Sequence, residues 1–95
     1  MKKIYDIVWT SQFKKDYKHA MKQHLDIAQL DTVIEKLASG GKLDAKYKDH
    51  PLKGNYKGYR ECHIQPDWVL VYKIFKDKLI LTLVSTGSHS NLFNE

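Results

Sequence analysis

A histidine and a carboxylate lie four residues apart in the segment YRECHIQPDWVLVYKI, residues 59–74. Apolar and β-branched residues on both sides predict two strands joined by a short turn, so that His63 ends one strand and Asp67 begins the next. A histidine titrates near neutral pH and can give or take a proton, and a nearby carboxylate can orient it. Strand alternation places His63 on the face of Tyr59 and Glu61. The pair therefore indicates acid–base chemistry, and the plainer alternative is a solvated pair of turn residues.

Two other histidines lie where a fold could bring them to this hairpin. His50 precedes a proline in a lysine-rich segment, which holds its backbone extended, although it could equally be an ordinary loop histidine. His89 follows the last apolar run, and Gly87 permits a turn that would return it toward the sheet. Phe93 either plugs the core or offers a nucleic-acid base a surface for stacking.

The charge balance favours a polyanionic partner. The formal net charge is +5 and the pI is about 9.3, and such a surface attracts phosphate through counterion release. Residues 42–58, KLDAKYKDHPLKGNYKG, interleave lysines with Tyr47 and Tyr56 among Gly, Pro, Asn and Asp. This composition predicts an irregular basic loop of the kind that lines a groove for single-stranded nucleic acid, unless it is only a solvated charge run. The lysines concerned are Lys46, Lys48, Lys53 and Lys57.

No metal or cofactor is expected. Side chains competent to bind a metal are present, but they lack a ligand spacing such as CxxC or HExxH, and there is no Gly-rich phosphate loop or GxSxG. A metal-free site of histidines and lysines matches RNA cleavage by transfer to the 2′-OH, in which a base removes the hydroxyl proton and an acid protonates the 5′-oxygen. The competent side chains are His50, His63, His89, Asp67 and Cys62.

The order of predicted elements is β-α-α-β-β-β, an α+β fold with two N-terminal helices on a small, mainly antiparallel sheet. Thr10 and Ser11 offer a cap for the first helix, whose stripe includes Phe13 and Met21, and SGG at 39–41 ends the second. The expected strands are 5–9, 59–64, 68–75 and 79–85, and the second helix begins near residue 26.

The overall composition is that of one domain covering residues 1–95. Apolar residues make up 42% of the chain, enough for a modest core, and the mean hydropathy is −0.54. No apolar run approaches the ~20 residues that span a bilayer, and the opening MKKIYDIVWTSQF lacks the apolar region of a signal peptide. A single cysteine, Cys62, excludes an intramolecular disulfide and suits a reducing cytoplasm, where we expect the protein to be.

YRECHIQPDWVLVYKI followed by LTLVSTGSHSNLF, with DHPLKGNYKGYRECHI upstream, closely resembles the YafQ branch of the RelE superfamily of bacterial toxins. The resemblance implies an endoribonuclease, an mRNA interferase that enters the ribosomal A site and cuts mRNA during translation. It also implies a DinJ-like antitoxin of the ribbon-helix-helix type, which wraps the toxin, covers the site and, in the complex, binds operator DNA. The toxin would be a monomer when free and part of a hetero-oligomer with its antitoxin.

The resemblance also assigns roles to individual residues. The catalytic residues would be His50, His63, Asp67 and His89. The resemblance also places Trp68 and Phe93, which would help to place a base, and the position of Ser85. Together with the basic residues of the composition argument, the predicted RNA- and ribosome-binding residues are Lys46, Lys48, Lys53, Lys57, Arg60, Trp68, Ser85 and Phe93.

Ser85 departs from the family pattern. The last strand of family members usually ends in an arginine, which the resemblance implies binds the scissile phosphate. A serine carries no charge, and removing one preorganised donor lowers a rate by ~10²–10³. Strand alternation points Arg60, the one arginine of the chain, away from His63, so Arg60 is not expected to replace it.

Three interpretations of Ser85 stay open. The chain is a toxin with a rearranged site, or a decayed toxin kept for antitoxin and operator binding, or a variant disarmed in the laboratory. The leading hypothesis is the active toxin, and the alternative is a catalytically weakened or inactive RelE-fold module.

Overall fold

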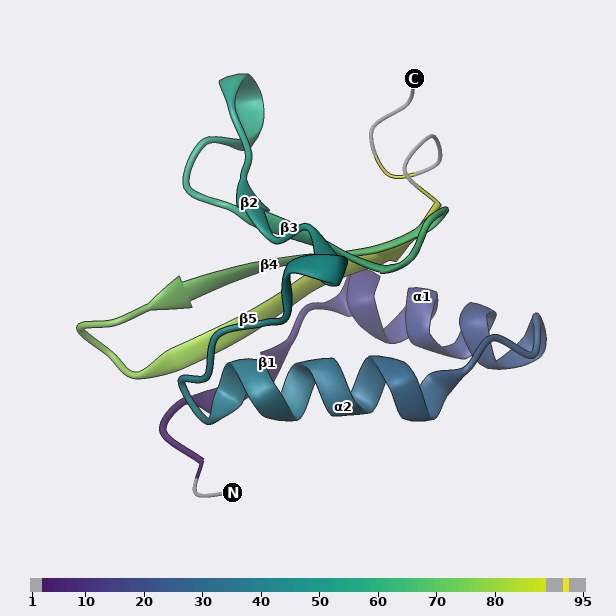
Figure 1. The fold of residues 1–95 in the computed structure, drawn as a ribbon, viewed down its shortest axis with the longest axis horizontal. Helices are drawn as coiled ribbons and strands as arrows, with labels where there is room; N and C mark the ends of the chain where they lie inside the picture. The colour runs from purple at the N-terminus through teal and green to yellow at the C-terminus, as the bar shows by residue number, and fades with distance from the viewer. Residues whose placement is uncertain (1–2, 89–91, 93–95) are drawn as a thin grey trace.

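The computed structural model describes residues 3–88 and 92, and Figure 1 shows two α-helices packed against one face of a five-stranded sheet. Two short 3-10 helices, η1 and η2, lie between the second α-helix and the third strand. In chain order the elements are β1 (Asp6–Trp9), α1 (Ser11–Lys22), α2 (Ile27–Ala38), η1 (Ala45–Tyr47), β2 (His50–Pro51), η2 (Gly54–Tyr56), β3 (Arg60–Gln65), β4 (Trp68–Phe75) and β5 (Ile80–Gly87).

Side-chain caps fix where the two α-helices begin. The hydroxyl of Thr10 accepts a hydrogen bond from the Phe13 backbone N–H, and the carboxylate of Asp26 accepts one from the Gln29 N–H. Each satisfies a donor that the first helical turn leaves free. Gly40, with φ +77°, adopts the left-handed conformation that ends α2, as the SGG sequence predicts.

The sheet has the strand order β1-β5-β4-β3-β2. β1 runs parallel to β5, and all other neighbours are antiparallel, which confirms the predicted α+β fold with a mainly antiparallel sheet. The predicted strand 68–75 is correct to the residue, while the others differ by one or two residues at their ends. These ends are where hydrogen bonding rather than residue type decides the boundary.

Alternate residues of the central strands form the core against the helices. The largest apolar side chains in it are almost inaccessible, and each contributes about 1.5–3 kcal/mol through burial. Met21 lies outside this core with 47% of its surface exposed, so its place in the predicted stripe of α1 is wrong. The core residues are Phe13, Ala20, Leu30, Val33, Ile34, Leu37, Ala38, Leu43, Cys62, Ile64, Trp68, Leu70, Tyr72, Leu81 and Leu83.

The basic segment 42–58 is more ordered than an irregular loop. It holds η1, η2 and the two-residue strand β2, whose residues His50 and Pro51 pair with Glu61 and Arg60 of β3. Figure 1 shows the chain rising from the end of α2 to β2, with η2 beyond it on the side of the sheet away from the helices. The start of the segment packs against α2, where Leu43 is part of the core. A strand of two residues is too short to show the alternation by which a sequence reveals a strand. Its pairing with β3 is what brings His50 beside that strand.

Within residues 3–88 and 92, no helix is long and apolar enough to cross a bilayer.

Candidate active site

A row of four neighbouring residues crosses the face of the sheet that the helices leave uncovered. Strand register pairs His50 of β2 with Glu61 of β3, Glu61 with Val71 of β4, and Val71 with Ser85 of β5. Residues paired across neighbouring strands point to the same face of a sheet. His63, two residues after Glu61, lies on this face as well. We call it the open face.

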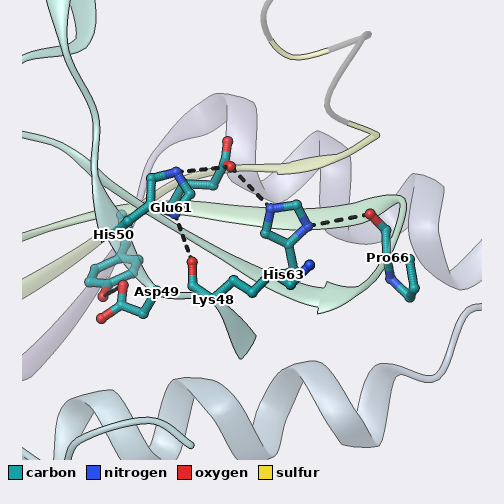
Figure 2. A network of polar contacts seen from close by, with 7 residues as sticks. Lys48, Asp49, His50, Glu61, His63 and Pro66 are labelled. Atoms are coloured by element: carbon teal, nitrogen blue, oxygen red, sulfur yellow. Dashed lines mark hydrogen bonds and ion pairs between the residues drawn. The ribbon is translucent and has the colours of Figure 1, made fainter. Parts of the chain in front are cut away.

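Glu61 lies between the two histidines. Its Oε1 atom is 3.5 Å from Nε2 of His50 and 3.4 Å from Nε2 of His63, and the side chain of Glu61 is only 2% exposed. Figure 2 shows both imidazole rings turned toward this carboxylate. The centroids of the two rings are 6.4 Å apart. A buried carboxylate needs partners that donate hydrogen bonds or carry positive charge. The two Nε2 atoms are partners that lie within reach of this carboxylate.

The other nitrogen of each ring is held by a backbone carbonyl. Nδ1 of His50 lies 2.7 Å from the Lys48 carbonyl oxygen, and Nδ1 of His63 lies 3.3 Å from that of Pro66. A carbonyl only accepts, so each Nδ1 carries a proton and each Nε2 is left to exchange one. With 47% of the His50 side chain and 24% of the His63 side chain exposed, a substrate can reach both rings.

A second polar cluster fixes the segment that carries His50. Asp49 accepts hydrogen bonds from the Tyr72 hydroxyl and, at 3.2 Å, from the Arg60 guanidinium. Tyr72 is buried in the core, and its burial, together with the hydrogen bond to Asp49, raises the pKa of its phenol. The Asp49 cluster therefore ties the residue before His50 to the protein interior.

Sequence comparison decides the family of this chain. A family model described as the YafQ bacterial toxin of type II toxin–antitoxin systems matches residues 5–94. The chain belongs to this family. It is 46% identical to the mRNA interferase toxin YafQ of Escherichia coli K12 over 89 aligned residues. This alignment covers 93% of this chain and 95% of that protein.

Solved structures of bacterial toxins have the same fold. In the E. coli DinJ–YafQ toxin–antitoxin complex, the matching chain is 42% identical with a TM-score of 0.87, over 95% of this chain and 98% of that one. A metal-bound toxin from Helicobacter pylori is 47% identical with a TM-score of 0.88, over 94% and 99% of the two chains.

The carboxylate beside His63 is that of Glu61 rather than Asp67. Asp67 is exposed in the β3–β4 turn, and within the described ranges it forms no ion pair with either histidine. Glu61 was expected on the face of His63, but its partnership with His50 depends on the β2–β3 pairing, which the sequence does not reveal. Asp49 and Tyr72 were missed for the same reason.

Trp68 is buried, which sets it apart from a surface stacking residue. It is 3% exposed, and its indole N–H donates to the hydroxyl of Thr86 at 2.9 Å. Of the other predicted YafQ-type site residues, His89 and Phe93 lie outside the described residues. The four loop lysines are all exposed: Lys46, Lys48, Lys53 and Lys57.

Neither Arg60 nor Ser85 can hold a phosphate beside the two histidines. The guanidinium of Arg60 is paired with Asp49, and alternation puts its side chain on the face opposite His63. Ser85 is two strands from Glu61, or ~10 Å at the usual spacing between strands, which is beyond the reach of a serine hydroxyl. Within the described part of the chain, no group of three or more His, Cys, Asp or Glu side chains is arranged to hold a metal ion.

Proposed function

We propose that this chain is a ribosome-dependent mRNA interferase, an endoribonuclease that cuts mRNA in the ribosomal A site and so stops translation. The observation that carries the proposal is the pair of Nε2 atoms, on His50 and His63, that converge on the buried carboxylate of Glu61. The chain is 46% identical to an mRNA interferase toxin, and this relationship supports the same class of reaction.

The reaction needs one base and one acid, and the two histidines supply them. One neutral Nε2 takes the proton of the substrate 2′-OH, whose oxygen forms a bond to phosphorus as the bond from phosphorus to the 5′-oxygen breaks. The protonated Nε2 of the other ring gives its proton to the departing oxygen. The products are a 2′,3′-cyclic phosphate and a 5′-hydroxyl. The distances of 3.5 and 3.4 Å to Glu61 are nearly equal, so Glu61 can stabilise the positive charge on either ring.

Other residues complete the proposed site. Asp67 assists from the β3–β4 turn, and His89 contacts the phosphate or protonates the leaving oxygen. The exposed lysines of 42–58 hold rRNA and mRNA through their phosphates. No metal takes part in the reaction.

The proposed partner is a DinJ-like antitoxin that covers the site, and the resulting hetero-oligomer binds operator DNA. The related YafQ in complex with DinJ supports this assignment. Since the ribosome is the proposed place of action, the toxin would work in the cytoplasm.

Primer extension on a reporter mRNA in a reconstituted translation system tests the proposal. The chain, treated with a chelator and desalted beforehand, is expected to make cuts that require ribosomes and disappear in His63→Ala. Cuts that persist in His63→Ala would contradict the mechanism, and equal cutting of naked RNA would contradict the dependence on ribosomes.

Ser85 supports a second candidate, a RelE-fold module that acts only through antitoxin and operator binding. Its short side chain on the open face, together with the pairing of Arg60, leaves the two histidines without a guanidinium. In the same assay, this candidate predicts no cuts from the chain and restored cuts from Ser85→Arg.

A further inference from the structure

A hollow of about 270 Å³ lies on the open face next to the row of Glu61, Val71 and Ser85. The segment with η2 forms one wall, and β4 and β5 form the floor. Its volume is below the range of roughly 300–1,000 Å³ for drug-sized ligands, so it suits a flat ring better than a whole nucleotide. The lining residues are Asn55, Tyr56, Tyr59, Val71, Val84, Ser85 and Leu92.

Two tyrosines give this hollow an aromatic wall. Tyr56 is 41% exposed, unusually open for a large aromatic side chain, and Tyr59 is half-buried beside it in the lining. Nucleic-acid bases stack on such rings whatever their sequence, because every base has a π-face. Ser85 is small enough to leave the far side of the hollow open.

Lys73 places a positive charge beside the hollow. It lies two residues after Val71 in β4 and therefore on the same face. Its Nζ is 5.2 Å from the ring centroid of Tyr59 and 4.8 Å from that of Phe75, close enough for cation–π attraction. In the part of the chain that the structure describes, no carboxylate lies within ion-pair distance of Lys73.

The backbone next to Tyr59 lies close to this lysine. Gly58, with a φ of +98°, is near enough that a Cβ atom there would be in ordinary contact with Nζ of Lys73, at 3.6 Å. Lys73 is thus held by aromatic rings rather than by an anion, in contrast to Arg60, which is paired with Asp49. A cation held in this way stays available to a phosphate.

We propose that the hollow receives one base of the bound RNA, stacked on the exposed ring of Tyr56, while Lys73, which lies over the ring of Tyr59, holds an adjacent phosphate; this inference rests on the proposed function of the site. The hollow adjoins the row that contains Glu61, so the stacked base fixes which internucleotide bond lies over the two histidines. Lys73, which lies outside the basic loop, then supplies the charge that Ser85 lacks.

Binding of a short 2′-O-methyl RNA at low salt tests the base subsite, because this RNA cannot be cleaved. One base is replaced by 2-aminopurine, whose fluorescence is quenched on stacking, and a matched RNA carries abasic sites. Tyr56→Leu is expected to lose the quenching and to weaken binding of the base-containing RNA about 10-fold, the order expected for one lost stack, while abasic RNA binds unchanged. Equal weakening for both RNAs, or no binding by the unaltered chain, would overturn the proposal.

The salt dependence of the same binding tests Lys73. Lys73→Met is expected to weaken both RNAs and to reduce the slope of log affinity against log salt by about 0.7, the amount for one phosphate contact on a single strand. Lys76→Met removes the same charge from the exposed β4–β5 turn and is expected to leave the slope unchanged. Equal slopes for Lys73→Met and Lys76→Met would overturn the assignment.

These outcomes separate the subsite from the proposed function. If Tyr56→Leu discriminates between the two RNAs but the chain makes no ribosome-dependent cuts, the subsite stands and the enzymatic function is wrong. If the chain cuts mRNA and Tyr56→Leu does not discriminate, the function stands and the subsite is wrong.

Discussion

The helix-covered face and the open face of the sheet use neighbouring residues of the same strands for opposite purposes. In β3, Cys62 and Ile64 are packed into the core, while Glu61 and His63 form the candidate site. In β4, buried Tyr72 is followed by Lys73 on the open face. Because side chains alternate along a strand, a substitution at one residue should alter the stability of the fold, and a substitution at the next should alter the chemistry of the candidate site.

The Asp49 cluster is the exception to this separation. Asp49 belongs to the segment of His50, yet its carboxylate accepts from Tyr72, which is part of the core. A change in this cluster should therefore affect both faces.

The largest expected effect is on the stability of the helix-covered face. Leu81 is fully buried, and Leu81→Ala should lower the free energy of unfolding by about 2–5 kcal/mol through lost burial and a cavity. Thr82, the next residue of β5, is half-buried on the open face, and Thr82→Ala should cost less than about 1 kcal/mol. Urea denaturation measures both, and similar losses would show that the two faces contribute equally to stability.

Removing the charge of Glu61 should harm cleavage without harming the fold. Glu61→Gln keeps the size of the side chain but no longer stabilises a positive charge on His50 or His63, so cleavage should fall by roughly 10²-fold. Burying a charge is costly, so the free energy of unfolding should stay the same or rise. Primer extension tests the expected fall in cleavage, and thermal denaturation tests the expected stability. A large drop in the melting temperature would assign Glu61 a structural role instead.

Asp49→Ala should couple the two faces. It leaves the Tyr72 hydroxyl and the Arg60 guanidinium without their acceptor, which should cost about 1–3 kcal/mol of stability. Cleavage should fall about 10-fold as well, because the backbone that positions His50 loses its attachment. Tyr72→Phe is the matched control: it removes one of the two hydrogen bonds, and both losses should be smaller. Normal cleavage by a destabilised Asp49→Ala would show that the cluster does not position His50.

The periodic parts of this fold could be predicted from the sequence. Apolar spacing predicts both helices, with a cap at Thr10 for the first, and apolar runs separated by short turns predict β3 to β5. The backbone of segment 42–58 could not be predicted, because the two residues of β2 have no period and their pairing is with β3, a later strand. The basic composition of this segment describes its surface and says little about its backbone.

The candidate site was predicted in part for the same reason. His63 and Glu61 share a face by strand alternation, which is a local property. Asp67 was chosen as the carboxylate partner because the predicted turn and the family resemblance both pointed to it, whereas contact with Glu61 depends on how the His63 ring turns. That His50 shares the same carboxylate depends on register between β2 and β3, and only the folded chain shows it.

The smallest expected effect concerns Cys62, which lies between Glu61 and His63 in sequence but on the opposite face. Burial, with added repulsion from the Asp49 and Glu61 carboxylates, raises the pKa of its thiol from about 9 to about 12. The folded state thus keeps this proton at a pH where the unfolded chain releases it. The resulting stability is fully present below the thiol's ordinary pKa and decreases as pH rises toward 12.

Urea denaturation between pH 8 and pH 10.5 tests the Cys62 prediction. The unaltered chain should lose more stability over this range than Cys62→Ala, because only the former releases a thiol proton on unfolding. The phenol of Tyr72, whose pKa is raised chiefly by burial and by its hydrogen bond to Asp49, contributes to both proteins and largely cancels in the comparison. Parallel pH profiles would mean that the Cys62 thiol ionises as readily in the folded chain as in the unfolded one. Water would then reach the helix-covered face at Cys62, and the two faces of β3 would differ less in burial than their packing indicates.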